Sequence, residues 1–148
     1  REAHKGRMAS MPYQLHRQLA ESGAARLFKG TDGYGDGEQR RDFIYVGDVV
    51  EANLHFMQAD PPVRGVFNLG SGAARSFNDI AAALIAEHGQ GRIEYFDMPE
   101  SLHGKYQNFT EADLTQLRAA GYEKPMTRLE EGIAACVPAW DEEPDLGE

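Results

Sequence analysis

Apolar residues recur at helical spacing in five stretches of the chain, and glycine or proline follows the end of each stretch. Each stretch also begins near a serine, threonine or aspartate, residue types whose side chains can cap a helix N-terminus. The spacing predicts helices over residues 10–22, 48–60, 76–88, 110–121 and 127–137. We expect Pro138 to end the last helix, because proline lacks the backbone N–H that a continuing helix needs.

Short runs of β-branched and aromatic residues lie between the predicted helices. These runs predict strands over residues 26–28, 40–46, 66–69 and 92–96. Strands that alternate with helices indicate an α/β fold. Because the strands are few and short, we expect them to complete a sheet whose other strands lie in a further domain. Without that domain, apolar surface would be exposed, which predicts a covering partner.

Composition narrows the function classes. The chain of 148 residues has 24 acidic and 15 basic side chains and a formal charge of −9, which argues against general binding to nucleic acid or anionic membranes. Cys136 is the single cysteine, so an intrachain disulfide is excluded and a reducing cytoplasm is the expected location. The sequence has neither a metal-ligand spacing nor an apolar run long enough for a membrane helix.

Four places concentrate groups that suit a phosphorylated polar ligand. Arginine and lysine complement phosphate oxygens, and aromatic rings can stack on a base or a sugar. The four places are His4 with Lys5 and Arg7, Arg40 with Arg41, the bend over residues 28–31, and Lys105 with Tyr106. Single charged residues are also common on any exposed surface, so for Lys5, Arg40 and Arg41 that simpler interpretation stays open.

The glycine-rich segment over residues 30–37 is predicted to be a flexible loop. It is interspersed with acidic residues, among them Asp32 and Asp36, and Glu38 follows it, whereas a phosphate-binding glycine loop must present its amides to an anion. The Gly70-Ser71-Gly72 sequence follows a predicted strand but lacks the third glycine and the later acid of a dinucleotide-binding fingerprint. We interpret it as a tight turn.

Three motifs resemble a known enzyme family. The sequence RDFIYVGDV over residues 41–49 is similar to a segment of the extended short-chain dehydrogenase/reductases that epimerise or dehydrate nucleotide sugars. Two narrower motifs, EAHKGRMAS over residues 2–10 and GKYQNFTEADLTQLRAAGY over residues 104–122, resemble the ADP-L-glycero-D-manno-heptose 6-epimerases. The resemblance extends from the start of the chain to about Trp140.

The resemblance implies an α/β chain that forms the C-terminal, substrate-binding part of an extended short-chain dehydrogenase/reductase and lacks most of the N-terminal Rossmann sheet. It implies a substrate-binding domain over residues 1–140, with elements that complete the Rossmann sheet. The acidic composition of residues 141–148 predicts a disordered tail. NADP would be bound mainly by the N-terminal dinucleotide domain, which is a partner that this chain does not contain. The family also implies a homo-oligomer, a pentamer, that serves bacterial lipopolysaccharide synthesis in the cytoplasm.

In the chemistry that the family implies, C6 of an ADP-heptose is oxidised to a ketone and then reduced from the other face. Lys5 matches one of the two acid/base residues and is also expected to contact the cofactor. The other is the tyrosine of a Y-x-x-x-K motif, which this sequence does not contain. A lysine can exchange a proton near neutral pH if burial or neighbouring cations lower its pKa, and His4 and Arg7 are candidates for such neighbours.

The family's substrate contacts carry over one position at a time. The matching residues are Arg7, Gln14, Phe28, Lys29, Gly30, Thr31, Arg41 and Tyr106. At Arg7 the family has a small hydroxyl residue and at Gln14 a histidine, although arginine and glutamine can still donate hydrogen bonds. Two alternatives remain: another nucleotide-sugar epimerase or dehydratase of the same superfamily, or a nucleotide-sugar-binding module without catalysis. The isolated chain is expected to be inactive without the N-terminal dinucleotide domain.

Overall fold

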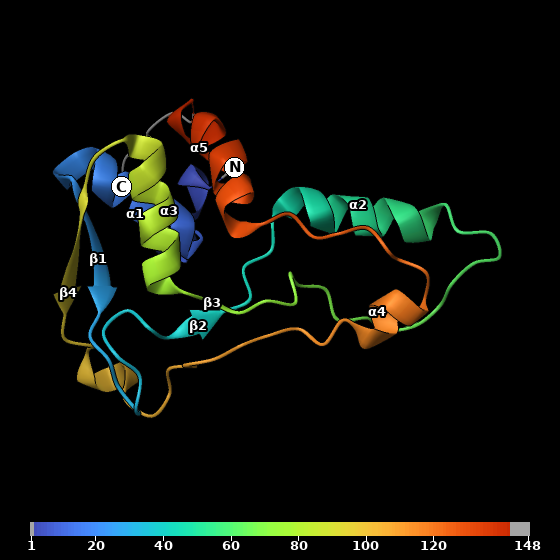
Figure 1. The fold of residues 1–148 in the computed structure, drawn as a ribbon, viewed down its shortest axis with the longest axis horizontal. Helices are drawn as coiled ribbons and strands as arrows, with labels where there is room; N and C mark the ends of the chain where they lie inside the picture. The colour runs from blue at the N-terminus through green and yellow to red at the C-terminus, as the bar shows by residue number, and fades with distance from the viewer. Residues whose placement is uncertain (1, 143–148) are drawn as a thin grey trace.

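The computed structural model describes residues 2–142, apart from the side chain of Arg7. In its main body, two helices pack on a pair of strands and a third helix packs against those two helices (Figure 1). The helices are α1 (Met11–Ser22), α3 (Phe77–His88) and α5 (Leu129–Asp141), and the strands are β1 (Ala24–Phe28) and β4 (Arg92–Phe96). Strand β1 pairs in parallel with β4, so Phe28 and Phe96 lie side by side at the carboxyl ends of both strands.

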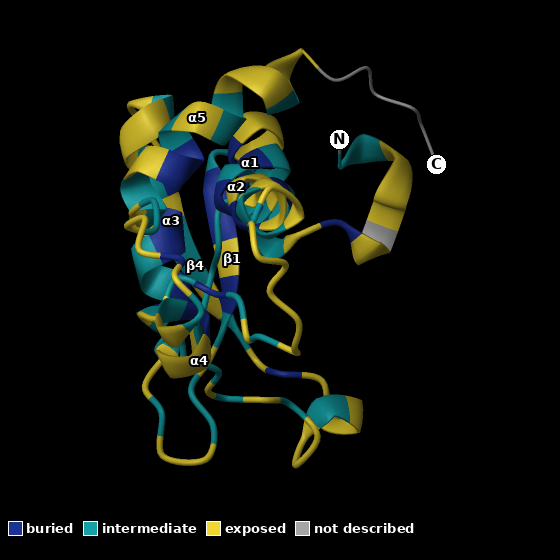
Figure 2. Ribbon diagram, turned by 90° about the vertical axis from the view of Figure 1, so that its right-hand side faces the viewer, coloured by how far each residue is buried: buried dark blue, intermediate teal, exposed yellow. Residues whose placement is uncertain are grey.

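The core of this body lies between β1 and the three helices. Figure 2 shows its buried residues on β1 and on the inner faces of the helices. The fully or nearly fully buried members are Leu15, Leu19, Ala25, Leu27, Phe77, Ile80, Ala81, Leu84 and Ile133. Leucine and isoleucine at helical spacing supply most of this set, as expected for helices that bury one face.

A second, smaller unit extends from the main body (Figure 1). It contains α2 (Val46–Met57) and the short helix α4 (Thr115–Ala119), which share a small cluster of Ala52, Leu117 and Tyr122. The two-residue strands β2 (Arg40–Arg41) and β3 (Arg75–Ser76) pair in antiparallel fashion between the two parts. Two 3₁₀ segments complete the described elements, η1 (Ala3–Met8) and η2 (Glu100–Leu102).

Several predicted elements are confirmed. The helix expected over residues 10–22 is α1, and the strands expected over residues 26–28 and 92–96 are β1 and β4. The helix expected over residues 76–88 is α3, which begins with a capping box in which Ser76 and Asp79 satisfy each other's backbone N–H groups. The mixed α/β fold class is likewise confirmed.

The strand predicted over residues 40–46 is wrong beyond Arg41. Only β2 forms, and α2 already begins at Val46, with Tyr45 as its N-cap residue. Asp48 therefore lies within the first turn of the helix. Its carboxylate is not available for capping because it accepts hydrogen bonds from the backbone N–H and the hydroxyl of Thr127, both at 2.8 Å. Thr127, far along the chain, thus binds the carboxylate that the sequence pattern predicted to cap the helix.

Two further predicted elements differ from the structure. Residues 66–69 form no strand, and Val66 is 90% exposed, since none of the described strands pairs with this segment. The helix expected from Thr110 shortens to α4, which begins at Thr115. The Thr110 hydroxyl accepts a hydrogen bond from the backbone N–H of Asp42 at 3.3 Å, so it caps nothing in its own segment.

The last helix also differs from its prediction, since α5 continues through Pro138 to Asp141. Trp140 follows that proline and packs edge-on against Tyr13 of α1, with ring centroids 5.8 Å apart. This tertiary contact stabilises the continued helix and offsets the backbone hydrogen bond that the proline cannot donate. The acidic tail expected over residues 141–148 is helical at Asp141, and residues 143–148 lie outside the described part of the chain.

Helix α2 exposes apolar side chains along one face. Val46, Val50, Leu54 and Met57 follow one another at helical spacing and are 64%, 52%, 46% and 80% exposed. A stripe of this kind is unusual on the surface of a soluble monomer and marks an interaction surface. It agrees with the expectation that apolar surface would be uncovered. Among the described helices, each is too short or too polar to cross a membrane.

Candidate functional site

An aromatic wall forms where the parallel strands β1 and β4 end. The ring of Phe28 lies 4.9 Å from that of Phe96, between centroids, and meets the ring of Tyr106 edge-on at 5.7 Å. Ligands of α/β proteins characteristically bind outside the carboxyl ends of parallel strands. This end of the β1–β4 pair is therefore a candidate binding site.

Arg41 brings a positive charge to the same wall. Its guanidinium carbon lies 5.1 Å from the centre of the Tyr106 ring and 6.0 Å from that of Phe77. Burial raises the pKa of Tyr106, and the nearby charge of Arg41 opposes this only in part, so the phenol is protonated at neutral pH. A cation held flat against aromatic rings can present its N–H groups to phosphate oxygens while the rings offer a stacking surface.

The bend over residues 29–31 continues directly from β1. The Lys29 N–H donates to the carbonyl of Phe96 at 2.9 Å, and its ammonium lies 3.0 Å from a carboxylate oxygen of Asp97. Gly30 donates its N–H to Asp36 at 2.8 Å, and a Cβ at this glycine would lie 1.9 Å from the carbonyl oxygen of Tyr34. The bend is thus a tightly closed turn that only glycine fits.

Three buried side-chain oxygens near this bend have no hydrogen-bond partner among the described residues. They are the hydroxyl of Thr31 and the amide oxygens of Gln39 and Asn108. The amide nitrogens are occupied, since Gln39 donates to the carbonyl of Lys29 at 3.2 Å and Asn108 to Asp32 at 2.9 Å. Buried polar atoms are normally hydrogen-bonded, so unused acceptors gathered in one place are a feature of binding sites.

Lys5 lies in a different place. It belongs to the 3₁₀ segment η1, where Gly6 adopts φ +50° and bends the chain. Its ammonium lies 2.7 Å from a carboxylate oxygen of Glu2, whose other oxygen accepts the Ser10 N–H at 2.8 Å. Both residues line a largely apolar pocket of about 360 Å³, together with Phe43, Tyr45, Cys136 and Trp140 among others.

The surroundings of Lys5 differ from the expected cationic field. The neighbour with which it pairs is the carboxylate of Glu2, while His4 is exposed and the side chain of Arg7 lies outside the described residues. Burial acts to raise the pKa of Glu2, but the hydrogen bonds from Lys5 and Ser10 and the charge of Lys5 outweigh it and lower that pKa. Lys5 therefore sits beside a fixed anion that can orient its ammonium.

The structure brings some of the predicted site residues together and leaves others apart. Tyr106 contacts both the ring of Phe28 and the guanidinium of Arg41, and the bend of Lys29, Gly30 and Thr31 follows Phe28 directly. Gln14 lies on α1 and donates to the carbonyl of Ala9 at 2.7 Å. Among the described residues, the pocket that Lys5 lines does not include Arg41. Phe43, which lines the same pocket as Lys5, packs edge-on against Phe77, whose ring lies near Arg41.

Sequence reasoning missed three residues at this site. Gln39 and Asn108 carry the unused acceptors, but isolated amides in loop segments give no signal in the sequence. Asp42, the residue after Arg41, accepts four hydrogen bonds, from Ser71, Gly72 and Ala112. The sequence does carry a signal for Asp42, because an acidic residue directly after two arginines and before an apolar run is unexpected in a strand.

Comparisons with known proteins agree with this picture. The model of the NAD dependent epimerase/dehydratase family matches residues 2–70. The ADP-L-glycero-D-manno-heptose-6-epimerase of Alkalilimnicola ehrlichii is 52% identical over 133 residues, which are 90% of this chain and 41% of that protein. The chain thus spans about two-fifths of the length of this relative.

Solved structures show the same relationship. The ADP-L-glycero-D-manno-heptose-6-epimerase of Helicobacter pylori superposes with a TM-score of 0.77 at 30% identity, over 95% of this chain and 40% of that chain. A UDP-glucuronic acid 4-epimerase of Bacillus cereus, in complex with a fluorinated UDP-sugar and NAD, gives a TM-score of 0.72 at 21% identity, over 90% of this chain and 40% of that one, and shares the fold. We conclude that the chain carries a segment similar to the NAD dependent epimerase/dehydratase family over residues 2–70 and is similar, over nine-tenths of its length, to ADP-L-glycero-D-manno-heptose-6-epimerases.

Proposed function

We propose that the chain is the substrate-binding part of an NADP-dependent enzyme that converts ADP-D-glycero-D-manno-heptose to ADP-L-glycero-D-manno-heptose through a 6-keto intermediate, for the lipopolysaccharide core. One observation carries the proposal: Arg41 lies over Tyr106, beside Phe28, at the carboxyl ends of two parallel strands. The substrate assignment is supported by the 52% identity to the Alkalilimnicola ehrlichii relative.

The residues of this site divide the work of holding a nucleotide sugar. Arg41 donates to the diphosphate, whose charge its guanidinium complements in two-pronged fashion. Phe28 and Tyr106 provide the wall against which a base or ribose stacks. The unused acceptors of Thr31, Gln39 and Asn108 can receive N–H or O–H groups of the bound nucleotide. Gln14 and Arg7 contact the sugar.

Lys5 is the proton-transferring residue of this chain. As the neutral amine, it can take a proton from the hydroxyl at C6 when that carbon is oxidised, and as the ammonium it can give a proton to the ketone oxygen when the carbon is reduced. Glu2 holds the ammonium in place. The apolar pocket beside it, formed in part by Phe43 and Trp140, limits access of water to the reacting carbon. The second acid/base residue, a tyrosine, belongs to the part of the protein that this chain does not contain.

The cofactor would supply reversible acceptance of a hydride, so that the epimerisation involves no net oxidation. Residues 2–142 do not by themselves fit a dinucleotide. Their two parallel strands lead into the bend over residues 29–31 and into η2, and Gly30 turns its N–H toward Asp36 instead of an outside anion. Binding of NADP is therefore assigned mainly to an N-terminal dinucleotide domain, with Lys5 as the contact from this chain.

That domain also accounts for the exposed stripe of α2. We assign the stripe of Val46, Val50, Leu54 and Met57 to the contact with the dinucleotide domain, since together they offer an apolar face that a covering domain would bury. The assembled protein is proposed to be a cytoplasmic homo-oligomer, a pentamer by family resemblance.

The test uses the full-length protein that contains this chain. Calorimetric titration should show tighter binding of ADP than of UDP or dTDP, and turnover of ADP-D-glycero-D-manno-heptose should be observed with NADP. Arg41→Ala should weaken ADP binding about tenfold or more, because a charge-assisted contact to phosphate is lost. Arg64→Ala, a change in an exposed loop arginine, is the matched control and should leave binding unchanged.

Two results would contradict the proposal. Tighter binding of a uridine or thymidine nucleotide would favour another epimerase or dehydratase of the superfamily, a possibility that the Bacillus cereus neighbour keeps open because it is bound to a UDP-sugar. Tight ADP binding without turnover in the full-length protein would favour a non-catalytic nucleotide-sugar-binding module.

A further inference from the structure

The carboxylate of Asp42 ties three separate segments of the chain together. One oxygen accepts the backbone N–H of Ser71 at 2.6 Å and its hydroxyl at 2.5 Å. The other accepts the N–H of Gly72 at 3.0 Å and the N–H of Ala112 at 2.9 Å. Burial by itself would raise the pKa of Asp42, but these hydrogen bonds outweigh it and lower the pKa, so the group is ionised at neutral pH.

The segment that carries Ala112 also carries Tyr106. It runs beside β2, because Arg40 donates its N–H to Asn108 at 2.8 Å and accepts the N–H of Thr110 at 3.2 Å. Asp42 extends this contact by donating its own N–H to the Thr110 hydroxyl and accepting from Ala112. The residue next to Arg41 thus fixes the strand-like segment that leads to Tyr106.

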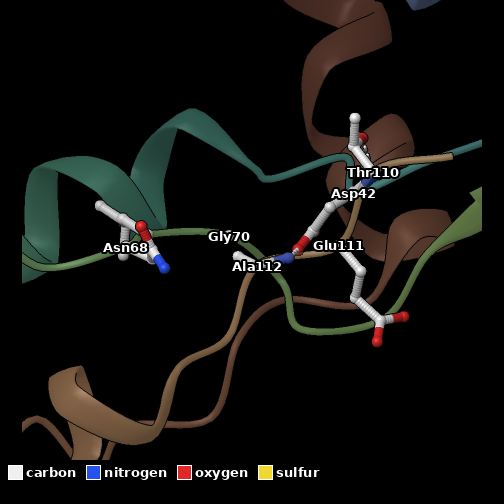
Figure 3. A pocket seen from close by; sticks show the side chains of 7 residues that line it. Asp42, Asn68, Gly70, Thr110, Glu111 and Ala112 are labelled. Carbon is white, nitrogen blue, oxygen red and sulfur yellow. Dashed lines mark hydrogen bonds between the residues drawn. The ribbon is translucent and has the colours of Figure 1, made fainter. Parts of the chain in front are cut away.

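Gly70 leaves the space that this arrangement needs. A Cβ at Gly70 would lie 2.4 Å from an Asp42 carboxylate oxygen and 2.6 Å from the Cβ of Ala112. Figure 3 shows the Asp42 side chain directed at the Ala112 nitrogen, with Gly70 passing close by. These residues line a shallow pocket of about 300 Å³. The close approach of all three segments at one carboxylate defines what we call the Asp42 clamp: Asp42, Gly70, Ser71, Gly72 and Ala112.

We propose that Asp42 is a positioning residue that holds Arg41 against Tyr106 in the geometry that receives the nucleotide diphosphate. The proposal rests on the proposed function, since Asp42 acts through Arg41 and does not itself touch the ligand. Four donors converge on one carboxylate and hold the backbone next to Arg41 in place. The Arg41 guanidinium is therefore already held against the Tyr106 ring before the ligand binds. Binding then does not have to order this side chain, which lowers its entropic cost.

The test compares Asp42→Asn with native full-length protein. Asparagine keeps the shape, but in either orientation its NH₂ group faces two donors, either the N–H and hydroxyl of Ser71 or the N–H groups of Gly72 and Ala112. One side of the clamp is therefore lost. We expect the dissociation constant for ADP, measured by calorimetry, to rise about tenfold while the protein remains folded. The Arg41 side-chain NMR signals, which the Tyr106 ring shifts in the native protein, should move toward their values in a flexible arginine.

A double-mutant cycle separates positioning from general stability. If Asp42 acts through Arg41, Asp42→Asn should weaken ADP binding much less in an Arg41→Ala background than in the native background. Asp113→Asn is the matched control, because this exposed acid of the same segment accepts a single backbone N–H, that of Thr115, and should leave both readouts unchanged.

The outcomes are distinct. A lower melting temperature with unchanged ADP affinity and unchanged Arg41 signals would show that Asp42 is only structural and would overturn the proposal. Additive effects in the cycle would overturn it as well. If the native protein does not bind ADP, the proposed function fails, whereas the Arg41 signals in Asp42→Asn still decide whether Asp42 positions Arg41.

Discussion

The guanidinium carbon of Arg41 lies 5.1 Å from the centre of the Tyr106 ring, although 64 residues separate the two in the sequence. Strand β2 holds the arginine and an irregular segment holds the tyrosine, and the backbone hydrogen bonds between Arg40, Asn108 and Thr110 bring them together. This contact is the centre of the candidate site, and the predictions follow outward from it.

The first prediction concerns the ring itself. Tyr106→Ala should weaken ADP binding about three- to thirtyfold, since a cation–π contact contributes about 0.5–2 kcal/mol and the stacking surface is lost as well. Tyr106→Phe keeps the ring and should retain binding within about twofold. Isothermal titration of both variants with ADP gives the answer, and equal losses in both would show that the hydroxyl, not the ring, is the contact.

The second prediction concerns Lys5. Lys5→Ala should lower the rate of epimerisation by about 10²–10⁴, the usual contribution of one acid/base group, with little change in the melting temperature. The lysine is exposed enough for its removal to spare the core. Lys124→Ala removes a lysine that pairs with Glu51 on the surface and serves as the control. Turnover at the native rate in Lys5→Ala would refute the acid/base assignment.

The third prediction concerns the bend after β1. Gly30→Ala should destabilise the protein by about 2 kcal/mol or more, because the new methyl group would collide with the Tyr34 carbonyl and the turn must open. Gly35→Ala in the same loop meets only the flexible Glu38 side chain, at 3.4 Å, and should be almost neutral. Urea unfolding of the two variants measures the difference, and equal stability would mean that the bend is not fixed.

The fourth prediction concerns His16, which is 2% exposed and lies 3.0 Å from a ring nitrogen of His88. Burial lowers the pKa of His16 below its ordinary value of 6.5, and the opposing charge of Asp141 restores it only in part. The folded state therefore prefers neutral His16. This stability is fully present above the unfolded pKa and is lost as the pH falls from about 6.5 toward the lower folded value.

Thermal unfolding between pH 8 and pH 5 tests this relationship. The melting temperature should fall with decreasing pH, and His16→Gln should flatten the fall because glutamine has no proton to take up. His4→Gln, a change at an exposed histidine, should keep the native slope. A slope in His16→Gln equal to that of the native protein would assign the pH dependence to other groups.

The fifth prediction concerns the exposed face of α2. Leu54→Gln should change the stability of the isolated chain by less than about 0.5 kcal/mol, as expected for a partly exposed side chain. In the full-length protein, where the proposed dinucleotide domain covers this face, the same change should cost about 2 kcal/mol. Leu15→Gln, in the core, should be severe in both. If Leu54→Gln has an equally small effect in both proteins, no domain covers the α2 face in the full-length protein.

Local patterns in the sequence determined most helices of the main body. The reciprocal hydrogen bonds of Ser76 and Asp79 start α3, and Gly23 and Gly89 end α1 and α3 in the left-handed conformation that glycine favours. These signals lie within a few residues of the structure they specify, so they can be read along the chain. The family motifs likewise indicate Arg41, Tyr106 and the bend over residues 28–31 from the sequence alone.

Tertiary structure decided the rest, because the deciding partners are far apart in the sequence. The Asp48 carboxylate accepts a hydrogen bond from Thr127, and the Thr110 hydroxyl accepts one from Asp42. Neither side chain caps the helix predicted to begin there, so both helices begin at other residues. Trp140 packs on α1, and α5 continues through a proline that was expected to end it. The Asp42 clamp is of the same kind: only folding brings four donors from two distant segments to one carboxylate, and nothing in the local sequence specifies which donors they are.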